Sequence, residues 1–330
     1  MSITHANISV FVPHLGCKHA CSFCNQVHIT SAHTLPDKES ITKAVMAAKT
    51  SKNYNPNNTQ LAFFGGSFTA IDRSYMLDLL KWGKTFIDSG DISGIRVSTR
   101  PDAINDEVLL LLKNYGVTAI ELGAQSLDDE VLSLNKRGHK AKDVVTASNL
   151  IKSYGFSLGL QMMTGLYGDT DEKAIKTARK IISLSPDTVR IYPTVVLKNT
   201  YLQKLFEEGV YTPQTVDAAA KLCSKLLLMF KAANINVIRL GLHSIEKDSF
   251  IAGPYHSAFG EIVESKICLE KLLKLLNNHP KGNYSVLVNT IEVSKFIGQK
   301  RANINALALL GYNVKIKGTN DIEIGELKCC

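Results

Sequence analysis

The chain has 330 residues, of which 45% are hydrophobic and 21% are charged, and this composition excludes an intrinsically disordered protein and predicts a sizeable apolar core. No run approaches the roughly 18 consecutive apolar residues of a membrane span, and the first residues lack the pattern of a secretory signal, so we expect a cytoplasmic protein without membrane attachment. The seven cysteines lack the spacing of a disulfide framework, and the formal charge of +8 is compatible with an anionic partner such as nucleic acid.

Short apolar runs rich in β-forming residues alternate with stretches of helical periodicity along most of the chain. Such alternation predicts parallel strands joined by crossover helices, and the near-continuous apolar character of the runs predicts burial on both faces. About six strand–helix repeats predict an α/β fold, a partial (β/α)6 TIM-like barrel. The predicted strands cover residues 8–14, 60–67, 94–100, 119–126, 157–163, 188–196 and 236–244.

The pattern changes after His243, and we place a boundary between a barrel, residues 1–245, and a small C-terminal α/β extension, residues 246–330. The extension is predicted to contain a helix at 264–278, followed by a strand, a helix and a closing hairpin. The second of these helices carries Lys295, Lys300 and Arg301, which could contact phosphates, although a solvated helix face is the default interpretation of this spacing.

Three closely spaced cysteines, Cys17, Cys21 and Cys24, follow the first predicted strand in the stretch GCKHACSFCNQ. The C-terminal end of a barrel strand is where such folds place their chemistry. Each iron of a four-iron cubane takes one ligand beyond its sulfides, so three thiolates leave one iron open to an exogenous ligand. The spacing is also compatible with a trio that only packs, or with a structural Cys3His zinc site completed by one of the nearby histidines, His14, His19 and His28.

A glycine pair, Gly65 and Gly66, ends the second predicted strand in the stretch FFGGSFT and is followed by Ser67. Paired glycines let the backbone approach a ligand closely, so that main-chain groups can bind it without an intervening side chain. A tight strand-to-helix turn would also explain an isolated pair. The stretch with the three cysteines, residues 16–26, is called here the cysteine loop. Because the glycine pair follows this loop at the end of the next strand, we favour the interpretation of the pair as a cofactor site.

The CxxxCxxC spacing with Phe23 before the last cysteine, followed by the glycine pair, resembles the signature of the radical S-adenosylmethionine (SAM) superfamily. The resemblance implies a [4Fe–4S] cluster on Cys17, Cys21 and Cys24, whose open iron binds SAM and which, once reduced, cleaves SAM to a 5′-deoxyadenosyl radical. Further stretches resemble the radical domain of the Elongator catalytic subunit and its bacterial relatives, which modify the wobble uridine of transfer RNA. These stretches cover residues 98–104, 120–139, 159–170 and 189–209.

Strand parity identifies polar side chains that face the barrel interior, because alternate residues of a strand share a face. Glu121, Gly123 and Gln125 share one face of the fourth predicted strand, and Gly159, Gln161 and Met163 share one face of the fifth. The resemblance implies that Gln125 and Gln161 lie beside the ribose or methionine part of SAM, and it makes Arg137 a candidate for the SAM carboxylate. Glu121 is predicted either to contact a ligand or to form an internal salt bridge with Arg96 or Arg100.

Three further residues are candidates for substrate contact. Tyr192 could touch the substrate or relay a radical, although a packed tyrosine with a satisfied hydroxyl is the alternative. Arg190 and Arg239 could hold an anionic group of the substrate. Cys223 and Cys268 are predicted to be core residues. The terminal pair, Cys329 and Cys330, is predicted to be a frayed tail, and a ligand to a second metal site or a redox handle is the alternative.

We therefore predict a radical SAM enzyme that requires an external one-electron donor. Transfer RNA is the first substrate hypothesis, and a small metabolite or a tetrapyrrole is the competing one. A non-catalytic metal-binding module that binds RNA is the alternative from another class. The chain departs from the Elongator subunit after the barrel, because its last residues show no glycine-rich phosphate loop of an acetyltransferase, which puts acetyl-type transfer in doubt.

Overall fold

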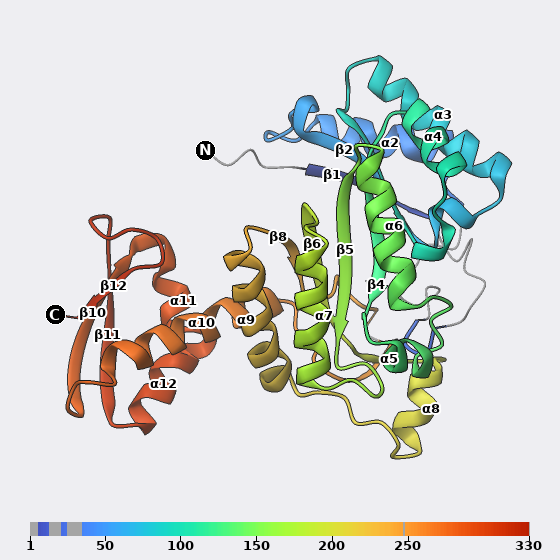
Figure 1. Cartoon of the computed structure of the whole chain (residues 1–330). Coiled ribbons are helices and arrows are strands. Elements are labelled where there is room, and N and C mark those ends of the chain that lie inside the picture. The colour runs from blue at the N-terminus through green and yellow to red at the C-terminus, as the bar shows by residue number, and fades with distance from the viewer. Residues whose placement is uncertain (1–5, 13–20, 25–34, 247, 330) are drawn as a thin grey trace.

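A parallel seven-stranded sheet forms the centre of the larger unit (Figure 1). The structure is a computed structural model, and it describes residues 6–12, 21–24, 35–246 and 248–329. The strand order is β1-β2-β3-β4-β5-β6-β8, so consecutive strands are neighbours. The strands are β1 (Ala6–Val12), β2 (Thr59–Gly65), β3 (Gly94–Thr99), β4 (Val117–Gln125), β5 (Ser157–Thr164), β6 (Thr188–Pro193) and β8 (Asn236–Leu240). All seven predicted strands are therefore confirmed, with ends that differ by a few residues.

Helices follow the strands along the chain. They are α2 (Lys38–Lys49), α3 (Arg73–Asp88), α4 (Asp106–Asn114), α5 (Asp129–Leu134), α6 (Ala141–Ser153), α7 (Asp171–Ser183), α8 (Tyr201–Glu207) and α9 (Val216–Ala232). Most of them cover the outer face of the sheet, whereas the short helices α5 and α8 lie beyond the C-terminal ends of the strands (Figure 1). Most of the helices begin at a residue whose side chain accepts a hydrogen bond from a backbone N–H of the first turn, which stabilises the helix end by about 1 kcal/mol. These capping residues are Asp37, Asp72, Asn105, Asp128, Thr170, Thr200 and Thr215.

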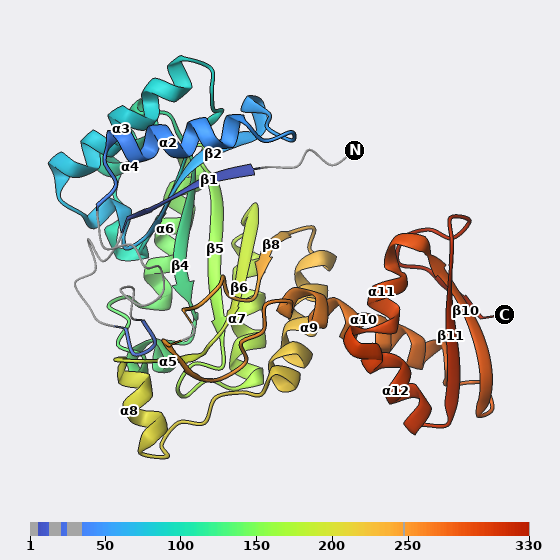
Figure 2. The ribbon, with the colours of Figure 1, turned by 180° about the vertical axis from the view of Figure 1, so that it is seen from behind.

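The sheet is curved and open, with β1 at one edge and β8 at the other (Figure 2). The predicted partial barrel is therefore confirmed. A bulge between Gly123 and Gln125 shifts the pairing of β4 with β5, so that Gln125 lies opposite Met162. The simple alternation that placed Gln125 on the face of Glu121 is interrupted at this bulge. The end of β4 is consequently distorted at the C-terminal edge of the sheet, near Cys21, which Arg137 links to Gly123.

The segment after β8 returns to the barrel before the chain leaves it (Figure 2). Its strand β9 (Phe250–Ala252) pairs antiparallel with β7 (Val196–Leu197), which follows β6. The backbone N–H of Lys198 also donates to Ser249 O at 2.9 Å. These contacts hold the segment across the C-terminal side of the sheet. Among the described helices, none is long and apolar enough to cross a membrane.

Residues 259–329 form a second unit, called here the C-terminal module. It contains α10 (Phe259–Leu276), β10 (Gly282–Asn289), α11 (Val293–Ile297), α12 (Ala302–Leu309), β11 (Tyr312–Thr319) and β12 (Leu327–Cys329). Its apolar cluster consists of Cys268, Leu272, Leu276, Val286, Val288, Phe296, Leu307 and Val314. Helix α10 is shared, because Val263 and Ile267 near its start belong to the barrel core. The boundary near residue 245 stays a prediction.

Two expectations for this module are wrong. The closing hairpin does not form, because β11 pairs parallel with β10 and β12 pairs antiparallel with the other edge of β10, which places Leu327 against the module core. Cys329 is likewise a strand residue opposite Val286 and not part of a frayed tail; Cys330 lies outside the described residues. Cys223 and Cys268 are buried as predicted, and burial raises the pKa of these thiols to about 12 and about 11.

Candidate active site

The cysteine loop is fixed to the barrel through Ser22, which is buried between Cys21 and Cys24. Its hydroxyl donates to Asn135 Oδ1 at 2.7 Å, and its backbone N–H donates to Asn135 O at 3.1 Å. Its carbonyl oxygen accepts the backbone N–H of Leu202, in the first turn of α8, at 2.7 Å. Residues 21–24 therefore lie between the end of α5 and the start of α8.

Asn135 organises this region, although sequence reasoning misses it. It is fully buried directly after α5, and its amide group donates to Val131 O at 2.8 Å and to Tyr167 O at 2.9 Å. Its side chain thus links the cysteine loop, α5 and the loop that follows β5. A polar residue between LSL and KR in the sequence gives no sign of these long-range contacts.

Arg137 lies beside the cysteine loop. Its Nη1 is 3.2 Å from Cys21 Sγ, and its Nη2 donates to Gly123 O at 2.6 Å. Its Nε is buried and has no hydrogen-bond partner among the described residues. A guanidinium N–H directed at a sulfur forms a charge-assisted contact when that sulfur is a thiolate. The side chain proposed for the SAM carboxylate is thus brought within reach of a proposed cluster ligand.

Cys21 and Cys24 are partly exposed and free of disulfide bonds. Between them, Phe23 packs against two small apolar clusters, one containing Val196 and Leu202 and the other containing Met163 and Tyr192. Phe23 therefore anchors the loop by packing. Cys17, and the histidines of the zinc alternative, His14, His19 and His28, lie outside the described residues.

The glycine pair makes a close backbone contact with the end of β1. Gly65 has φ +120°, and a Cβ at this position would lie 2.4 Å from Val12 O and 2.8 Å from the Phe11 ring. The backbone N–H of Gly66 donates to Val12 O at 3.0 Å. The glycine pair therefore joins the end of β2 to the end of β1, close to the cysteine loop. The tight turn and the proposed cofactor site, which were alternative interpretations of the pair, are thus compatible with each other.

Replacing Gly65 with alanine is expected to destabilise the fold by at least about 2 kcal/mol, because strained φ and the clash with Val12 act together. Gly90 provides a matched control: it has φ +73°, and a Cβ there would have no neighbouring atom within 4 Å, so Gly90→Ala carries only the conformational cost of about 1 kcal/mol. Chemical denaturation measures both. Equal destabilisation by the two substitutions would contradict the close approach at Gly65.

Ser67 is used to fix the loop after β2. Its hydroxyl is hydrogen-bonded to Thr99 Oγ1 at 2.9 Å and accepts the backbone N–H of Arg100 at 3.2 Å. Thr69 Oγ1 reaches the same Thr99 hydroxyl at 2.6 Å. These contacts tie the loops after β2 and β3 together beside the glycine pair.

A buried charged cluster lies inside the sheet around Glu121. Arg190 binds this carboxylate with two N–H groups at 2.8 and 3.0 Å, and Arg96 Nη1 lies 3.2 Å from it. Gln161 Nε2 donates to the same carboxylate at 3.1 Å. Burial alone would raise the pKa of Glu121, but the two guanidinium groups outweigh it and hold the pKa below its ordinary value. Glu121 is thus ionised and paired.

This cluster decides between the alternatives for Glu121. The internal salt bridge is confirmed for Arg96 and is wrong for Arg100, which instead binds Asp102 with N···O distances of 2.9 and 2.5 Å. The partner that sequence reasoning missed is Arg190, whose charge is compensated by Glu121. Gly159 makes room for the cluster, because a Cβ there would lie 2.7 Å from Glu121 Cγ.

Gln125 ends β4 in a left-handed conformation with φ +62°, which is uncommon for a residue with a side chain. Its Oε1 is buried without a hydrogen-bond partner among the described residues. Strained residues and unsatisfied buried polar atoms concentrate at functional sites. Gln125 therefore has an acceptor that fits a bound polar ligand, whereas Gln161 is already engaged by Glu121.

Tyr192 and Arg239 lie on the neighbouring strands β6 and β8. Burial raises the pKa of Tyr192, so its hydroxyl stays protonated at neutral pH. Arg239 donates to Gly241 O at 3.1 Å and to Leu242 O at 2.8 Å, and so stabilises the turn after β8. His139 is buried near Arg137, and burial lowers its pKa to about 4, so it is neutral.

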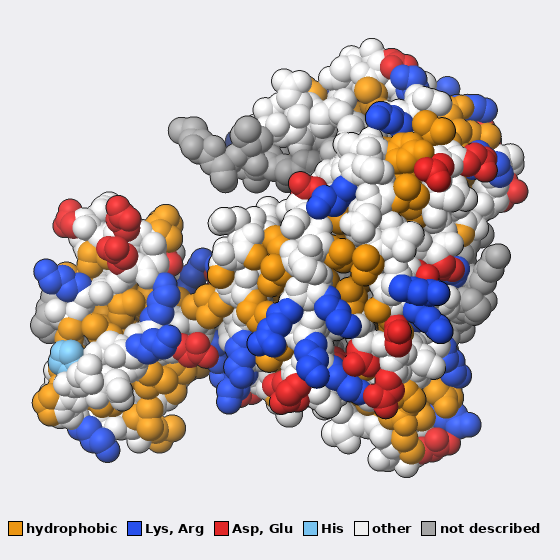
Figure 3. Space-filling model, viewed as in Figure 1, with side chains coloured by type: hydrophobic (Ala, Val, Ile, Leu, Met, Phe, Trp, Pro, Cys, Tyr) orange, Lys and Arg blue, Asp and Glu red, His pale blue; other side chains and the backbone are white. Residues whose placement is uncertain are grey.

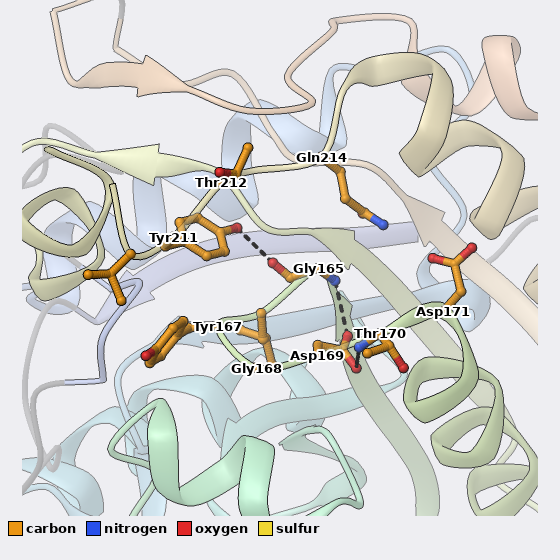
Figure 4. A pocket seen from close by; sticks show the side chains of 11 residues that line it. Gly165, Tyr167, Gly168, Asp169, Thr170, Asp171, Tyr211, Thr212 and Gln214 are labelled. Atoms are coloured by element: carbon orange, nitrogen blue, oxygen red, sulfur yellow. Dashed lines mark hydrogen bonds between the residues drawn. The ribbon is translucent and has the colours of Figure 1, made fainter. Parts of the chain in front are cut away.

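A cavity of about 250 Å³ lies between the loop after β5 and the segment that connects α8 to α9 (Figure 4). Tyr211 Oη donates to Gly165 O at 2.7 Å, and Asp169 accepts the backbone N–H groups of Gly165 and Thr170 at 3.1 and 3.0 Å. Gln214 Oε1 is buried with no partner among the described residues. The sequence does not predict this cavity, because its two walls, residues 165–171 and 210–214, are far apart along the chain.

Burial raises the pKa of Asp169 from 3.8 to about 6. The folded protein therefore holds this proton more tightly than the unfolded chain, and the associated stabilisation is lost as pH rises from about 4 to 6, by roughly 2 kcal/mol for a partly exposed group. In Asp169→Asn this loss is expected to disappear from the pH profile of the unfolding free energy. The exposed Asp171→Asn is the control, and identical profiles for both variants would contradict the assignment.

Comparison with known proteins decides the family. The family model described as the radical SAM superfamily matches residues 11–181, and a model described as the radical SAM C-terminal domain matches residues 186–268. The chain belongs to the radical SAM superfamily. The cofactors of this family are a [4Fe–4S] cluster and SAM, so the predicted family, enzyme class and cofactors are confirmed.

Individual relatives include members of the predicted branch and one protein outside it. A tRNA uridine(34) acetyltransferase of Dehalococcoides mccartyi is 26% identical over 243 residues, covering 62% of this chain and 52% of the relative. Human Elongator complex protein 3 is 30% identical over 139 residues, covering 41% and 25%. The heme chaperone HemW of Bacillus subtilis is 25% identical over 196 residues, covering 58% and 52%. The chain thus spans about half or less of the length of these relatives.

The fold has a counterpart among solved structures. The archaeal Methanocaldococcus infernus Elp3 superposes with a TM-score of 0.62 at 20% identity, covering 84% of this chain and 65% of that chain. At this identity the likeness shows the shared fold alone.

Proposed function

We propose that this radical SAM protein modifies transfer RNA, with the reaction centre at the cysteine loop. The observation that supports this reaction centre is the position of Cys21 and Cys24 at the C-terminal edge of the parallel sheet, with Arg137 against Cys21 and the glycine pair at the end of the next strand. The residues fit the cofactors, because Gln125 Oε1 and Arg137 Nε are buried polar atoms without partners among the described residues.

Each part of the site has a proposed role. Cys17, Cys21 and Cys24 hold the cluster, and Ser22 and Asn135 keep the loop in place. The backbone at Gly65, Gly66 and Ser67 and the amide of Gln125 receive SAM. A [4Fe–4S] cluster held there and reduced by an external donor would supply the electron for cleavage of SAM to methionine and a 5′-deoxyadenosyl radical.

We assign the charged cluster around Glu121 a positioning role rather than substrate binding. Glu121 compensates Arg190 and orients Gln161 across the interior of the sheet. Tyr192, next to Phe23 in the same apolar cluster, is the proposed substrate contact. Arg239 acts on the turn after β8.

Transfer RNA is proposed as the substrate because of the relatives and the surface charge. Figure 3 shows Lys and Arg side chains gathered over α7 and α9 on one flank of the barrel. The exposed residues of these helices include Lys176, Arg179, Lys180, Lys221 and Lys225. Such a surface attracts a polyanion, and phosphate contacts release counterions and make binding dependent on salt.

The test measures 5′-deoxyadenosine formation from SAM by the reconstituted, reduced protein, alone, with total transfer RNA, and with a porphyrinogen. We expect transfer RNA to accelerate formation and a new mass to appear in digested transfer RNA. Acceleration by the porphyrinogen with no effect of transfer RNA would contradict the proposal and favour the competing substrate class.

A further inference from the structure

The C-terminal module contains a β–α–α–β unit in chain order, formed by β10, α11, α12 and β11. The two strands are parallel neighbours in the sheet, and the helices pack on one face of it, on the side toward α9 (Figure 1). A short loop, Gly298-Gln299-Lys300-Arg301, separates the two helices. From this unit and its loop we propose that the module is an RNA-binding surface, in which the loop contacts the phosphate backbone of a single-stranded segment.

The sequence predicts one helix through this loop, and that prediction is wrong. Lys300 and Arg301 have φ +50° and +63°, so two consecutive residues with side chains adopt the left-handed conformation. Gly298 also has positive φ, and a Cβ there would lie 2.9 Å from Ser265 Oγ and 3.0 Å from the backbone of Asn303. The chain therefore turns outward between α11 and α12 instead of continuing as a helix.

The loop is held in this form by a buried side chain. The amide group of Asn303 donates to Ser265 O at 2.9 Å, to Phe296 O at 3.1 Å and to Lys295 O at 3.2 Å. These carbonyls belong to α10 and α11, so Asn303 joins three helices beneath the loop. The outward turn is consequently a fixed feature of the packed module.

Two cations of the loop form no salt bridge within the described part of the chain. Lys300 and Arg301 are exposed, and neither forms a salt bridge with a described residue. Lys295, in contrast, is paired with Glu264 at 2.5 Å. Of the three cations expected to lie on one helix face, the two loop residues are therefore available to an anionic partner.

An exposed apolar face continues from the loop along α12. Ala302 and Leu309 are exposed and Ala306 is half-buried, and these residues lie three or four positions apart on one side of the helix. The exposed fraction of Leu309 is 89%. Cations beside a small apolar surface are complementary to a single-stranded nucleic acid. Its phosphates would contact the cations, and its unstacked bases would contact the apolar surface.

KH modules bind RNA through a GXXG loop that clamps the backbone of four nucleotides, and the loop here shares the first glycine of that pattern, Gly298. Here the fourth position of the loop is Arg301, in a conformation that glycine adopts without strain. Arg301 therefore adds a positive charge at the position where the GXXG motif has an uncharged glycine. Figure 3 shows further Lys and Arg side chains over the module helices and the neighbouring α7 and α9, so one RNA can contact both.

This inference deepens the proposed function by naming the element that holds the RNA, but its test requires neither SAM nor reducing agent. Binding of labelled transfer RNA to the full chain, with and without reconstituted cluster, is measured by fluorescence anisotropy across a salt series. The test variant is Lys300→Asn with Arg301→Asn, because asparagine tolerates the left-handed conformation. The control removes the same charge from exposed residues of β11, through Lys315→Gln with Lys317→Gln.

We expect the loop variant to lose about tenfold in affinity and its salt slope to fall by about 1.4, as for two contacts to a single strand. The control is expected to lose less than about threefold. Equal losses in both variants, no loss in the loop variant, or no binding by the parent chain would overturn the inference. Binding that depends on the loop, combined with SAM cleavage that ignores transfer RNA, would leave the inference standing and contradict the proposed function.

Discussion

Cys21→Ala is expected to lose the cluster and to reduce 5′-deoxyadenosine formation to background. Three thiolates are the minimum that holds a four-iron cluster with one open iron, and removal of one leaves a second iron without a protein ligand. Iron and sulfide content and the visible absorption of the reconstituted protein measure the effect.

Cys329→Ala is the matched control, since Cys329 is a half-buried thiol of the C-terminal module that no part of the proposed site uses. Its iron content is expected to equal that of the parent. If the Cys21 variant kept four irons and its activity, Cys21 would not be a ligand of the cluster.

Glu121→Gln is expected to destabilise the protein by about 3–5 kcal/mol. The substitution keeps the size of the side chain but leaves the guanidinium groups of Arg96 and Arg190 buried near each other without a compensating charge. Chemical denaturation of the protein without its iron–sulfur cluster measures this loss of stability without interference from cofactor binding.

Glu107→Gln provides the control for this change, because Glu107 forms its ion pair with Arg73 at the surface, at 2.7 Å. Such a pair contributes at most about 1 kcal/mol. If the two glutamine variants unfolded at the same denaturant concentration, the buried cluster would not stabilise the barrel.

The strands were predictable from the sequence because a sheet buried on both faces requires continuous apolar runs separated by helical periodicity. The cysteine trio and the glycine pair could be singled out as a candidate site, since each motif is local in sequence. Glu121 was recognisable as a buried acid, but its main partner Arg190 lies 69 residues away along the chain. Strand parity shows which side chains share a face of the sheet, but it does not show which of them form an ion pair.

Other features depended on packing that leaves no local pattern. Asn135 looks like an ordinary polar residue after a helix, yet it holds the cysteine loop through Ser22. The residues around Gly298 have adequate helix propensity and therefore predict a helix, whereas the contacts of Asn303 with two other helices fix an outward turn. In both cases tertiary hydrogen bonds override the local preference.

The most direct test of the account is anaerobic reconstitution with iron and sulfide, followed by reduction and measurement of 5′-deoxyadenosine from SAM. We expect about four irons per chain and 5′-deoxyadenosine that is absent from the Cys21→Ala protein. Zinc in place of iron, or a full cluster that produces no 5′-deoxyadenosine either alone or with transfer RNA, would contradict the account.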